Sequence, residues 1–188
     1  MEIGRGDTMK DIGTKLIETD RLILRRFVIS DAVKVYNGWT SDENTSKYVS
    51  WDAHKNVDET MKVVSNWIKE YESDSYNWVV EIKETKELIG NISVISVSKK
   101  HHNCEVGYCY GSKYWNKGFA TEALKAVINY MLNECEMHIV EAKHYSTNPA
   151  SGRVMEKAKM IKEAILKERR YNETDNSYID LICYYIKK

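Results

Sequence analysis

Residues 114–131 read YWNKGFATEALKAVINYM. From residue 120 onward the apolar side chains recur at i, i+3, i+4, i+7, i+8 and i+11, which predicts an amphipathic helix. Gly118 stands directly before this helix, after Asn116 and Lys117. The first N–H groups of a helix lack intrahelical partners, the helix dipole favours an anion there, and glycine lets the backbone approach one closely. The stretch therefore predicts a strand-to-helix turn that binds phosphate, with a tight turn that binds nothing as the alternative.

Two common phosphate-binding motifs are absent from the sequence. It contains neither the GxxxxGK[ST] of a nucleotide P-loop nor the GxGxxG of a dinucleotide-binding fold. One glycine before a helix does not decide between a phosphate site and a plain turn, so the rest of the chain must.

Strand and helix patterns flank the central helix on both sides. Before it, three strand-like runs over 77–82, 87–97 and 104–110 are joined by the short polar links KETK and SKKHHN, as antiparallel hairpins require. The other predicted elements are a strand over 21–27, a helix with Ser30 as N-cap, a helix over 57–71, a strand over 138–145, a helix over 148–158, and two strands within 160–187.

This order of elements predicts an α/β (α+β) fold, with a mixed, mostly antiparallel sheet and helices on both faces. The unit over 105–145 is expected to be a parallel strand–helix–strand crossover. A chain of 188 residues fits one domain. We expect that domain over 16–188 and a flexible tail over 1–15, in which either Met1 or Met9 is the native start.

Composition narrows the classes of function. The 28 basic and 28 acidic side chains cancel and are interleaved, which argues against nucleic acid as a partner. No apolar run approaches a membrane span and no signal-peptide pattern opens the chain, so we expect a cytoplasmic protein without a membrane partner. The four cysteines show no CxxC or zinc-type spacing, and His101, His102 and Cys104 in a predicted turn give no metal prediction.

Four motifs together resemble the GNAT superfamily of N-acetyltransferases: NKGFATEAL, EVGYCY before it, and NPASGRVMEKA and SYIDLICYYI after it. More narrowly, they resemble the branch that contains the ribosomal-protein N-terminal acetyltransferases. The resemblance runs from about residue 16 to 187. It implies a GNAT-type fold, acetyl-coenzyme A as co-substrate, no metal, and, by analogy, a homodimer.

The resemblance also implies which residues bind coenzyme A. In the family the loop before the central helix grips the pyrophosphate, and the backbone of the preceding strand pairs with the pantetheine arm. Arg153 is a contact by the same analogy, with a solvated helix face as the alternative. The implied cofactor-binding residues are Asn116, Lys117, Gly118, Phe119, Ala120, Thr121, Tyr108, Cys109, Tyr110, Asn148, Ser151 and Arg153.

Two residues are catalytic candidates. Asn148 and Pro149 are explained as the N-cap and first residue of a helix, but that role does not require Ser151. Ser151 could hydrogen-bond the leaving sulfur, and the resemblance implies that it is the general acid. Glu105 is the first candidate for the base, because relatives use a carboxylate on the central strand through water. A strand carboxylate without a catalytic role is its alternative, and Glu168 is the second candidate.

The sequence departs from the family at one helix end. The helix after Ser151 ordinarily ends in Leu-Gly-Phe, whereas this chain has Ala158, Lys159 and Met160. Loss of the glycine removes the residue that most easily adopts the left-handed cap of a helix.

The acceptor is expected to be an amine, most simply the α-amine of a ribosomal or other protein N-terminus. An α-amine of pKa about 8 costs about 1.4 kcal/mol to deprotonate at pH 7, against about 4.6 for lysine, so a weak base suffices. The alternatives are a small cationic amine (an aminoglycoside or polyamine) and a non-catalytic acyl-coenzyme A-binding module. Aromatic and acidic residues that could hold a cation are Trp39, Tyr48, Trp51, Trp67, Asp42, Glu43, Asp52 and Asp58.

Overall fold

The structure is a computed structural model of the chain that describes residues 9–73, 75–173 and 176–188. Its centre is an eight-stranded sheet in the order β1-β2-β3-β4-β5-β6-β8-β7. Neighbouring strands are antiparallel except β5 and β6, which are parallel. The predicted mixed sheet is thereby confirmed. The strands are β1 (Ile17–Glu18), β2 (Leu22–Arg25), β3 (Asn77–Ile82), β4 (Leu88–Ser98), β5 (Asn103–Tyr110), β6 (Ile139–Tyr145), β7 (Ile161–Asn172) and β8 (Ser177–Lys187).

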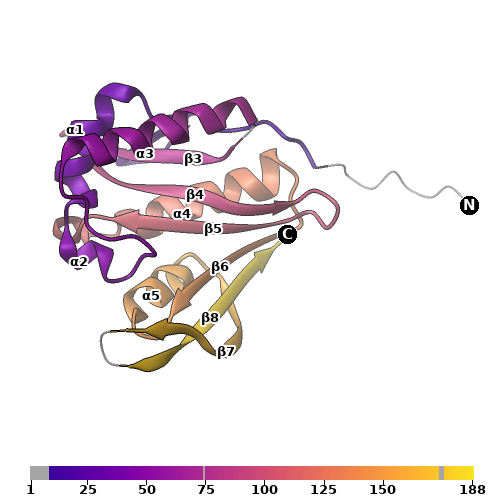
Figure 1. Cartoon of the computed structure of the whole chain (residues 1–188). Helices are drawn as coiled ribbons and strands as arrows, with labels where there is room; N and C mark the ends of the chain where they lie inside the picture. Colours follow the sequence, from indigo (N-terminus) through magenta and orange to yellow (C-terminus); the bar gives the residue numbers. More distant parts are fainter. Residues whose placement is uncertain (1–8, 74, 174–175) are drawn as a thin grey trace, which may run out of the picture.

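Helices cover both faces of this sheet (Figure 1). Helices α1 and α3 pack on one face, and α4 and α5 pack on the other, as the order of elements predicts. The α-helices are α1 (Ala32–Val35), α2 (Glu43–Ser46), α3 (Val57–Glu70), α4 (Phe119–Asn129) and α5 (Pro149–Lys157). π-helical turns extend α1 over Tyr36–Thr40 and α4 over Tyr130–Glu134, and 3₁₀ turns lie at Ile29–Asp31, Tyr71–Ser73 and Ser112–Tyr114.

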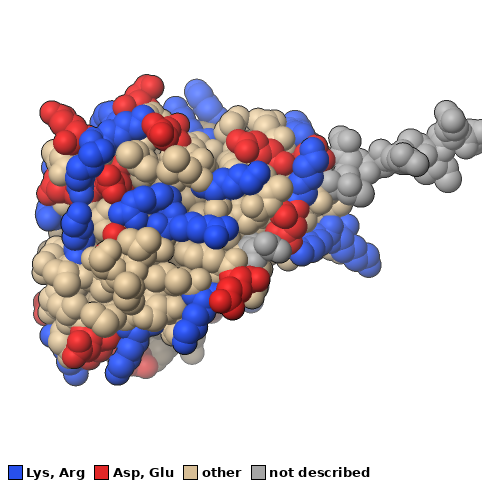
Figure 2. Space-filling view, turned by 90° about the horizontal axis from the view of Figure 1, so that it is seen from above, with Lys and Arg blue, Asp and Glu red and all other residues tan. Residues whose placement is uncertain are grey.

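The sheet therefore separates two hydrophobic cores. Strand β3 contributes to both, because it is covered on both sides: Trp78 and Val80 face the α4 core, and Val79 faces the α1–α3 core. This explains why its sequence is a continuous apolar run instead of an alternating one. The outer surface carries both signs of charge, and Figure 2 shows Lys and Arg mixed with Asp and Glu on the side where α1 and α3 lie.

Two N-terminal features differ from the predictions. A two-residue strand, β1, precedes β2 and was not predicted. Ser30 is not an N-cap: the helical segment opens with the 3₁₀ turn, and its first residue follows Val28. The carboxylate of Asp31 accepts the Val28 N–H at 2.9 Å and pairs with the Arg25 guanidinium at 2.8 Å. Ser30 is the second residue of that turn, so it lies inside the helical segment and cannot cap it.

Residues 9–15, which the sequence assigns to a tail over 1–15, pack against the domain. Thr14 is buried, and its Oγ1 accepts the Asn77 N–H at 2.9 Å. The packed part of the chain therefore begins before the predicted boundary at residue 16. Residues 1–8 lie outside the described residues.

The two parallel strands part after a short contact. Strands β5 and β6 are paired through three residue pairs only, the last being Glu105 with Glu141. Beyond it β5 stays paired with β4 as far as Tyr110, and β6 with β8 as far as Tyr145. Figure 1 shows the two strands side by side at their starts and diverging toward their ends. The parallel unit predicted over 105–145 is confirmed. Because its two strands separate after Glu105, the sheet has an opening at its middle.

Helix α5 ends without the glycine that the resemblance leads us to expect. Lys159 has a φ of 69°, in the left-handed region. Its N–H bonds the carbonyl of Glu156 at 2.9 Å, and the N–H of Met160 bonds the carbonyl of Met155 at 3.0 Å. This pair of bonds is a Schellman cap, formed here with lysine at the position that favours glycine. The chain therefore forms this helix end at a conformational cost.

This cost predicts the effect of Lys159→Gly. A non-glycine residue in the left-handed region loses about 1 kcal/mol, so we expect the variant to be more stable by about that amount. The melting temperature should rise by about 2–4 °C, measured by thermal unfolding. Lys157→Gly, within the helix, is the control and should destabilise by about 1 kcal/mol. A Lys159→Gly variant no more stable than the unaltered protein would contradict the account.

Candidate active site

The turn into α4 leads directly into the helix, and its glycine has a left-handed conformation that was not predicted. Gly118 is the N-cap residue of α4, with a φ of 81° and a ψ of −2°. A Cβ at this position would meet only the Arg21 Nη2 atom, at 3.4 Å, so the backbone conformation and not space requires glycine. Asn116 is also left-handed, with a φ of 61°. Asn116, Lys117 and Gly118 are exposed, so the free N–H groups at the start of α4 face solvent.

Basic side chains lie beside this turn. Lys113 and Lys117 both place their ammonium groups over the Tyr114 ring, with the nitrogens 4.8 and 5.7 Å from the ring centre. Phe119, Ala120 and Thr121 form the first turn of α4 and are half-buried. Positive charge, a helix N-terminus and a left-handed glycine thus occur together, an arrangement that suits an anion.

The structure brings two of the predicted site residues into contact. The Tyr108 hydroxyl lies 2.8 Å from Ser151 Oγ and donates to the Ser151 carbonyl at 3.0 Å. Burial raises the pKa of Tyr108, so the phenol stays protonated. Ser151 lies in the first turn of α5, where its N–H bonds the side chain of the N-cap Asn148 at 3.3 Å. A serine hydroxyl is thereby fixed at a helix N-terminus by a tyrosine from β5.

The remaining predicted residues near β5 and α5 have different surroundings. Burial raises the pKa of Cys109 to about 12, so its thiol is protonated and is a poor nucleophile at neutral pH. Tyr110 is buried, and its hydroxyl has no hydrogen-bond partner among the described residues. Arg153 is exposed on the outer side of α5. Of these three, the structure brings none into contact with Ser151.

Glu105 lies at the last pair before β5 and β6 part. Its Oε2 atom pairs with Lys143 Nζ at 2.6 Å, and this hydrogen bond raises the pKa of Lys143. Side chains alternate along β5, so Glu105 is on the α1–α3 face with Cys109, whereas Tyr108 is on the α4–α5 face. Glu105 and Tyr108 therefore flank the opening from opposite faces of the sheet.

Glu168, the second candidate for the base, lies in an irregular part of β7. The register with β8 shifts between Leu166 and Arg170, and Glu168 has a φ of 57°. Its N–H bonds the Asp180 carboxylate at 3.0 Å, while its own side chain is exposed. This geometry marks a bulge and gives Glu168 no partner that would make it a base.

Asp42 has a structural role in the predicted acceptor region. Its carboxylate accepts the Ser112 N–H at 2.8 Å, the Thr45 hydroxyl at 2.8 Å and the Asn44 N–H at 3.0 Å. Partial burial acts in the opposite direction, but the hydrogen bonds from Ser112, Thr45 and Asn44 lower the pKa of Asp42 to about 2. The carboxylate thus joins α2 to the loop after β5 and is not available to an amine.

The aromatic residues of that region divide into core and surface. Trp39 is fully buried, and Trp67 packs on Phe27 with ring centres 4.8 Å apart. Tyr48 is exposed and makes an edge contact with Trp115, with ring centres 5.9 Å apart.

Sequence reasoning missed Trp115, whose indole N–H bonds the Tyr110 carbonyl at 2.7 Å. The only signal for it was its position just before the glycine turn.

Two negative findings hold for the part of the chain that the structure describes. In it, no helix is both long enough and apolar enough to cross a membrane. Nor do any three His, Cys, Asp or Glu side chains in these residues lie close enough together to hold a metal ion.

Comparisons with known proteins agree with this geometry. A sequence profile described as "Acetyltransferase (GNAT) domain" matches residues 21–161. An uncharacterized N-acetyltransferase of Bacillus subtilis (strain 168), YoaA, is 30% identical over 157 residues, covering 83% of this chain and 88% of the relative. The [ribosomal protein uS5]-alanine N-acetyltransferase of Escherichia coli (strain K12) is 27% identical over 161 residues, covering 81% of each protein.

A solved structure has the same fold. The crystal structure of an acetyltransferase (GNAT family) from Bacillus anthracis matches with a TM-score of 0.81 at 28% sequence identity. The match covers 92% of this chain and 98% of the other. The similarity therefore includes the sheet, both helical layers and the site between them.

The Asp42 carboxylate predicts a pH dependence of stability. A carboxyl whose pKa is lowered by folding stabilises the protein above its unfolded pKa, and this stabilisation is lost as pH falls through the folded pKa. We expect Asp42→Asn to lower the free energy of unfolding at pH 7, and the difference from the unaltered protein to shrink as the pH falls from 3.8 to about 2. Denaturant unfolding at several pH values measures it.

Asp52→Asn is the matched control, because it removes the same charge from an exposed position in the neighbouring loop. It should change stability little at any pH. An Asp42→Asn variant that loses no more stability than this control at pH 7 would show that the hydrogen bonds of the Asp42 carboxylate do not stabilise the fold.

Proposed function

The chain belongs to the GNAT family of acetyltransferases, and we propose that it moves the acetyl group of acetyl-coenzyme A to the α-amine of a protein N-terminus, by direct attack in a ternary complex. The main support for this proposal is that the pairing of β5 with β6 ends after Glu105, beside the turn with the left-handed Gly118. Backbone N–H groups of β5 that lack a partner on β6 and the N-terminus of α4 would then lie along one path. Such a path suits an extended arm that ends in a diphosphate.

The cofactor roles follow from these positions. The turn over 116–121 would bind the pyrophosphate, and the backbone of Tyr108, Cys109 and Tyr110 would pair with the pantetheine arm. When bound, acetyl-coenzyme A supplies an acetyl thioester. A β5 N–H directed at the thioester carbonyl would stabilise the negative charge that develops on its oxygen during attack.

Ser151 would act as the general acid and Glu105 as the general base. The amine nitrogen forms a bond to the acetyl carbon while the carbon–sulfur bond breaks, and the sulfur leaves with the bonding electrons. Ser151 Oγ, which the Tyr108 hydroxyl holds in place, would donate a proton to this thiolate. The N-terminus of α5 would stabilise the negative charge on the sulfur. Glu105, on the opposite face, would take the proton from the amine through water. The buried Cys109 thiol offers no acyl-enzyme route.

Three observations support an N-terminal α-amine as acceptor. One relative that matches over most of both chains is named for the alanine of a ribosomal protein. Glu105, the first candidate for the base, already accepts a hydrogen bond from Lys143, which suits an amine of low pKa better than lysine. Asp42, one of the acids that would attract a small cationic amine, is used within the fold.

A panel of acceptors tests the proposal. We expect acetylation, followed by mass spectrometry, of a lysine-free peptide with a free N-terminus. The same peptide with a blocked N-terminus and one internal lysine should react much more slowly. An aminoglycoside and a polyamine complete the panel. Faster reaction with either would replace the protein acceptor with a small cationic one, and acetyl-coenzyme A binding without turnover on any amine would favour a binding module.

Ser151→Ala tests the proposed acid. Loss of a general acid lowers kcat by about a hundredfold, whereas the affinity for acetyl-coenzyme A should change by less than about threefold. Steady-state kinetics and calorimetric titration give the two values. Ser146→Ala, at an exposed position near the end of β6, is the control and should match the unaltered protein. Equal kcat in the Ser151 and Ser146 variants would remove Ser151 from the mechanism.

A further inference from the structure

One arginine outside the predicted site contacts both sides of the glycine turn. Arg21 lies just before β2, far from the turn in sequence. Its Nη1 donates to the carbonyl of Lys117 at 3.1 Å, and its guanidinium carbon lies 4.6 Å from the centre of the Phe119 ring. Lys117 and Phe119 are the neighbours of Gly118, and Arg21 Nη2 is the atom that a Cβ at Gly118 would approach.

The same arginine is joined to a carboxylate in the first turn of α4. Arg21 Nε bonds Glu122 Oε2 at 2.7 Å, and Nη2 contacts that oxygen at 2.6 Å. The other oxygen, Oε1, accepts the Thr19 hydroxyl at 2.6 Å and the Arg21 N–H at 2.9 Å. Partial burial acts in the opposite direction, but these hydrogen bonds lower the pKa of Glu122, which is therefore ionised.

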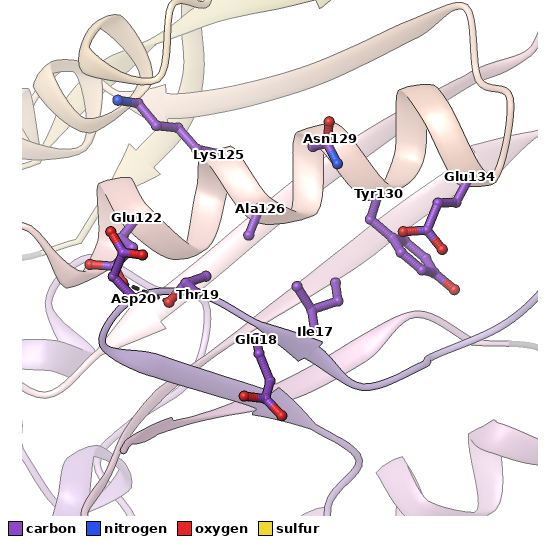
Figure 3. A pocket seen from close by; sticks show the side chains of 10 residues that line it. All are labelled: Ile17, Glu18, Thr19, Asp20, Glu122, Lys125, Ala126, Asn129, Tyr130 and Glu134. Atoms are coloured by element: carbon purple, nitrogen blue, oxygen red, sulfur yellow. Dashed lines mark hydrogen bonds between the residues drawn. The ribbon is translucent and has the colours of Figure 1, made fainter. Parts of the chain in front are cut away.

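Figure 3 shows how Glu122, Thr19 and Asp20 lie. The Glu122 side chain reaches from the first turn of α4 toward the β1–β2 turn, where it meets Thr19, with Asp20 alongside. A shallow groove continues from there along α4, past Lys125, to Asn129. The hydrogen bond between Glu122 and Thr19 joins the start of α4 to the β1–β2 edge of the sheet.

A carboxylate in the first turn of α4 has opposite effects on the helix and on a bound anion. Its negative charge stabilises the positive end of the helix dipole. The same charge repels a phosphate held by the N–H groups of that turn. An arginine that pairs with Glu122 offsets the repulsion, while its Nη1 donates to the Lys117 carbonyl. All three nitrogens of the Arg21 guanidinium are thus engaged with the protein, which suits an organising role rather than direct contact with the anion.

We propose that Arg21 is a positioning residue for the phosphate-binding turn of acetyl-coenzyme A. It holds Lys117 and Phe119 on either side of Gly118 and neutralises Glu122, so that the N–H groups at the start of α4 are in place for a diphosphate before the ligand arrives. The inference rests on the proposed function, because it requires that this turn bind coenzyme A.

Two ligands separate positioning of the turn from a general effect on the fold. Coenzyme A carries the diphosphate and pantetheine does not, so only coenzyme A should depend on Arg21. We expect Arg21→Ala to weaken coenzyme A binding at least tenfold in calorimetric titration. Pantetheine binding, followed by ligand-observed NMR at high ligand concentration, should change less than twofold.

A second variant tests the charge argument. Arg21→Ala leaves Glu122 without its neutralising partner, so adding Glu122→Gln should recover part of the lost coenzyme A affinity, by threefold or more. A purely structural loss would not be recovered by removing a second partner. Arg26→Ala is the matched control: its guanidinium also bonds a backbone carbonyl, that of Thr14, and also lies over an aromatic ring, that of Tyr71, but away from the turn.

The outcomes distinguish the two claims. If the unaltered protein does not bind coenzyme A, the proposed function fails and the role of Arg21 fails with it. If the unaltered protein binds but Arg21→Ala binds equally well, only the role of Arg21 is overturned. It is also overturned if pantetheine loses as much affinity as coenzyme A, if Arg26→Ala weakens coenzyme A binding as strongly as Arg21→Ala, or if the double variant recovers nothing.

Discussion

The short pairing of β5 with β6 is the constraint on which the site depends. Three residue pairs join the strands, and the chain then leads them apart while each remains paired on its outer side. Backbone N–H groups of β5 beyond Glu105 are therefore left without a strand partner inside the sheet, where they would ordinarily be satisfied. A ligand that runs along β5 can supply those partners. The glycine turn, the Tyr108–Ser151 contact and the Glu105–Lys143 pair all lie around this opening.

Charge around the opening is balanced by specific pairs. Glu105 is paired with Lys143, and Glu122 is paired with Arg21. The free positive charge at the turn comes from helix N–H groups and from the nearby lysines. The proposed site for a polyanion therefore relies on helix N–H groups and a few lysines, in a sequence of zero formal net charge.

The sequence predicts what depends on local patterns and misses what depends on contacts across the fold. The apolar stripe of α4 and the cap of α5 by Asn148 are each encoded within a few residues, and both are confirmed. The contact between Tyr108 and Ser151 joins residues 43 apart in sequence, and that between Arg21 and Glu122 joins residues 101 apart. Such contacts leave no periodic signal. Ser30 was misjudged for the same reason, because the group that satisfies the helix start is held by an arginine on another element.

The weak junction between β5 and β6 also has a mechanical meaning. Every other pair of long strands in the sheet is joined over four or more residue pairs. Strands β6, β8 and β7 can rotate as one group relative to the first five strands. Such a rotation breaks fewer hydrogen bonds between strands when it occurs at the β5–β6 junction than at any other long pair. The line of least stiffness in the sheet coincides with the opening that the proposed cofactor would occupy, so the width of that opening is the dimension of this fold that changes most easily.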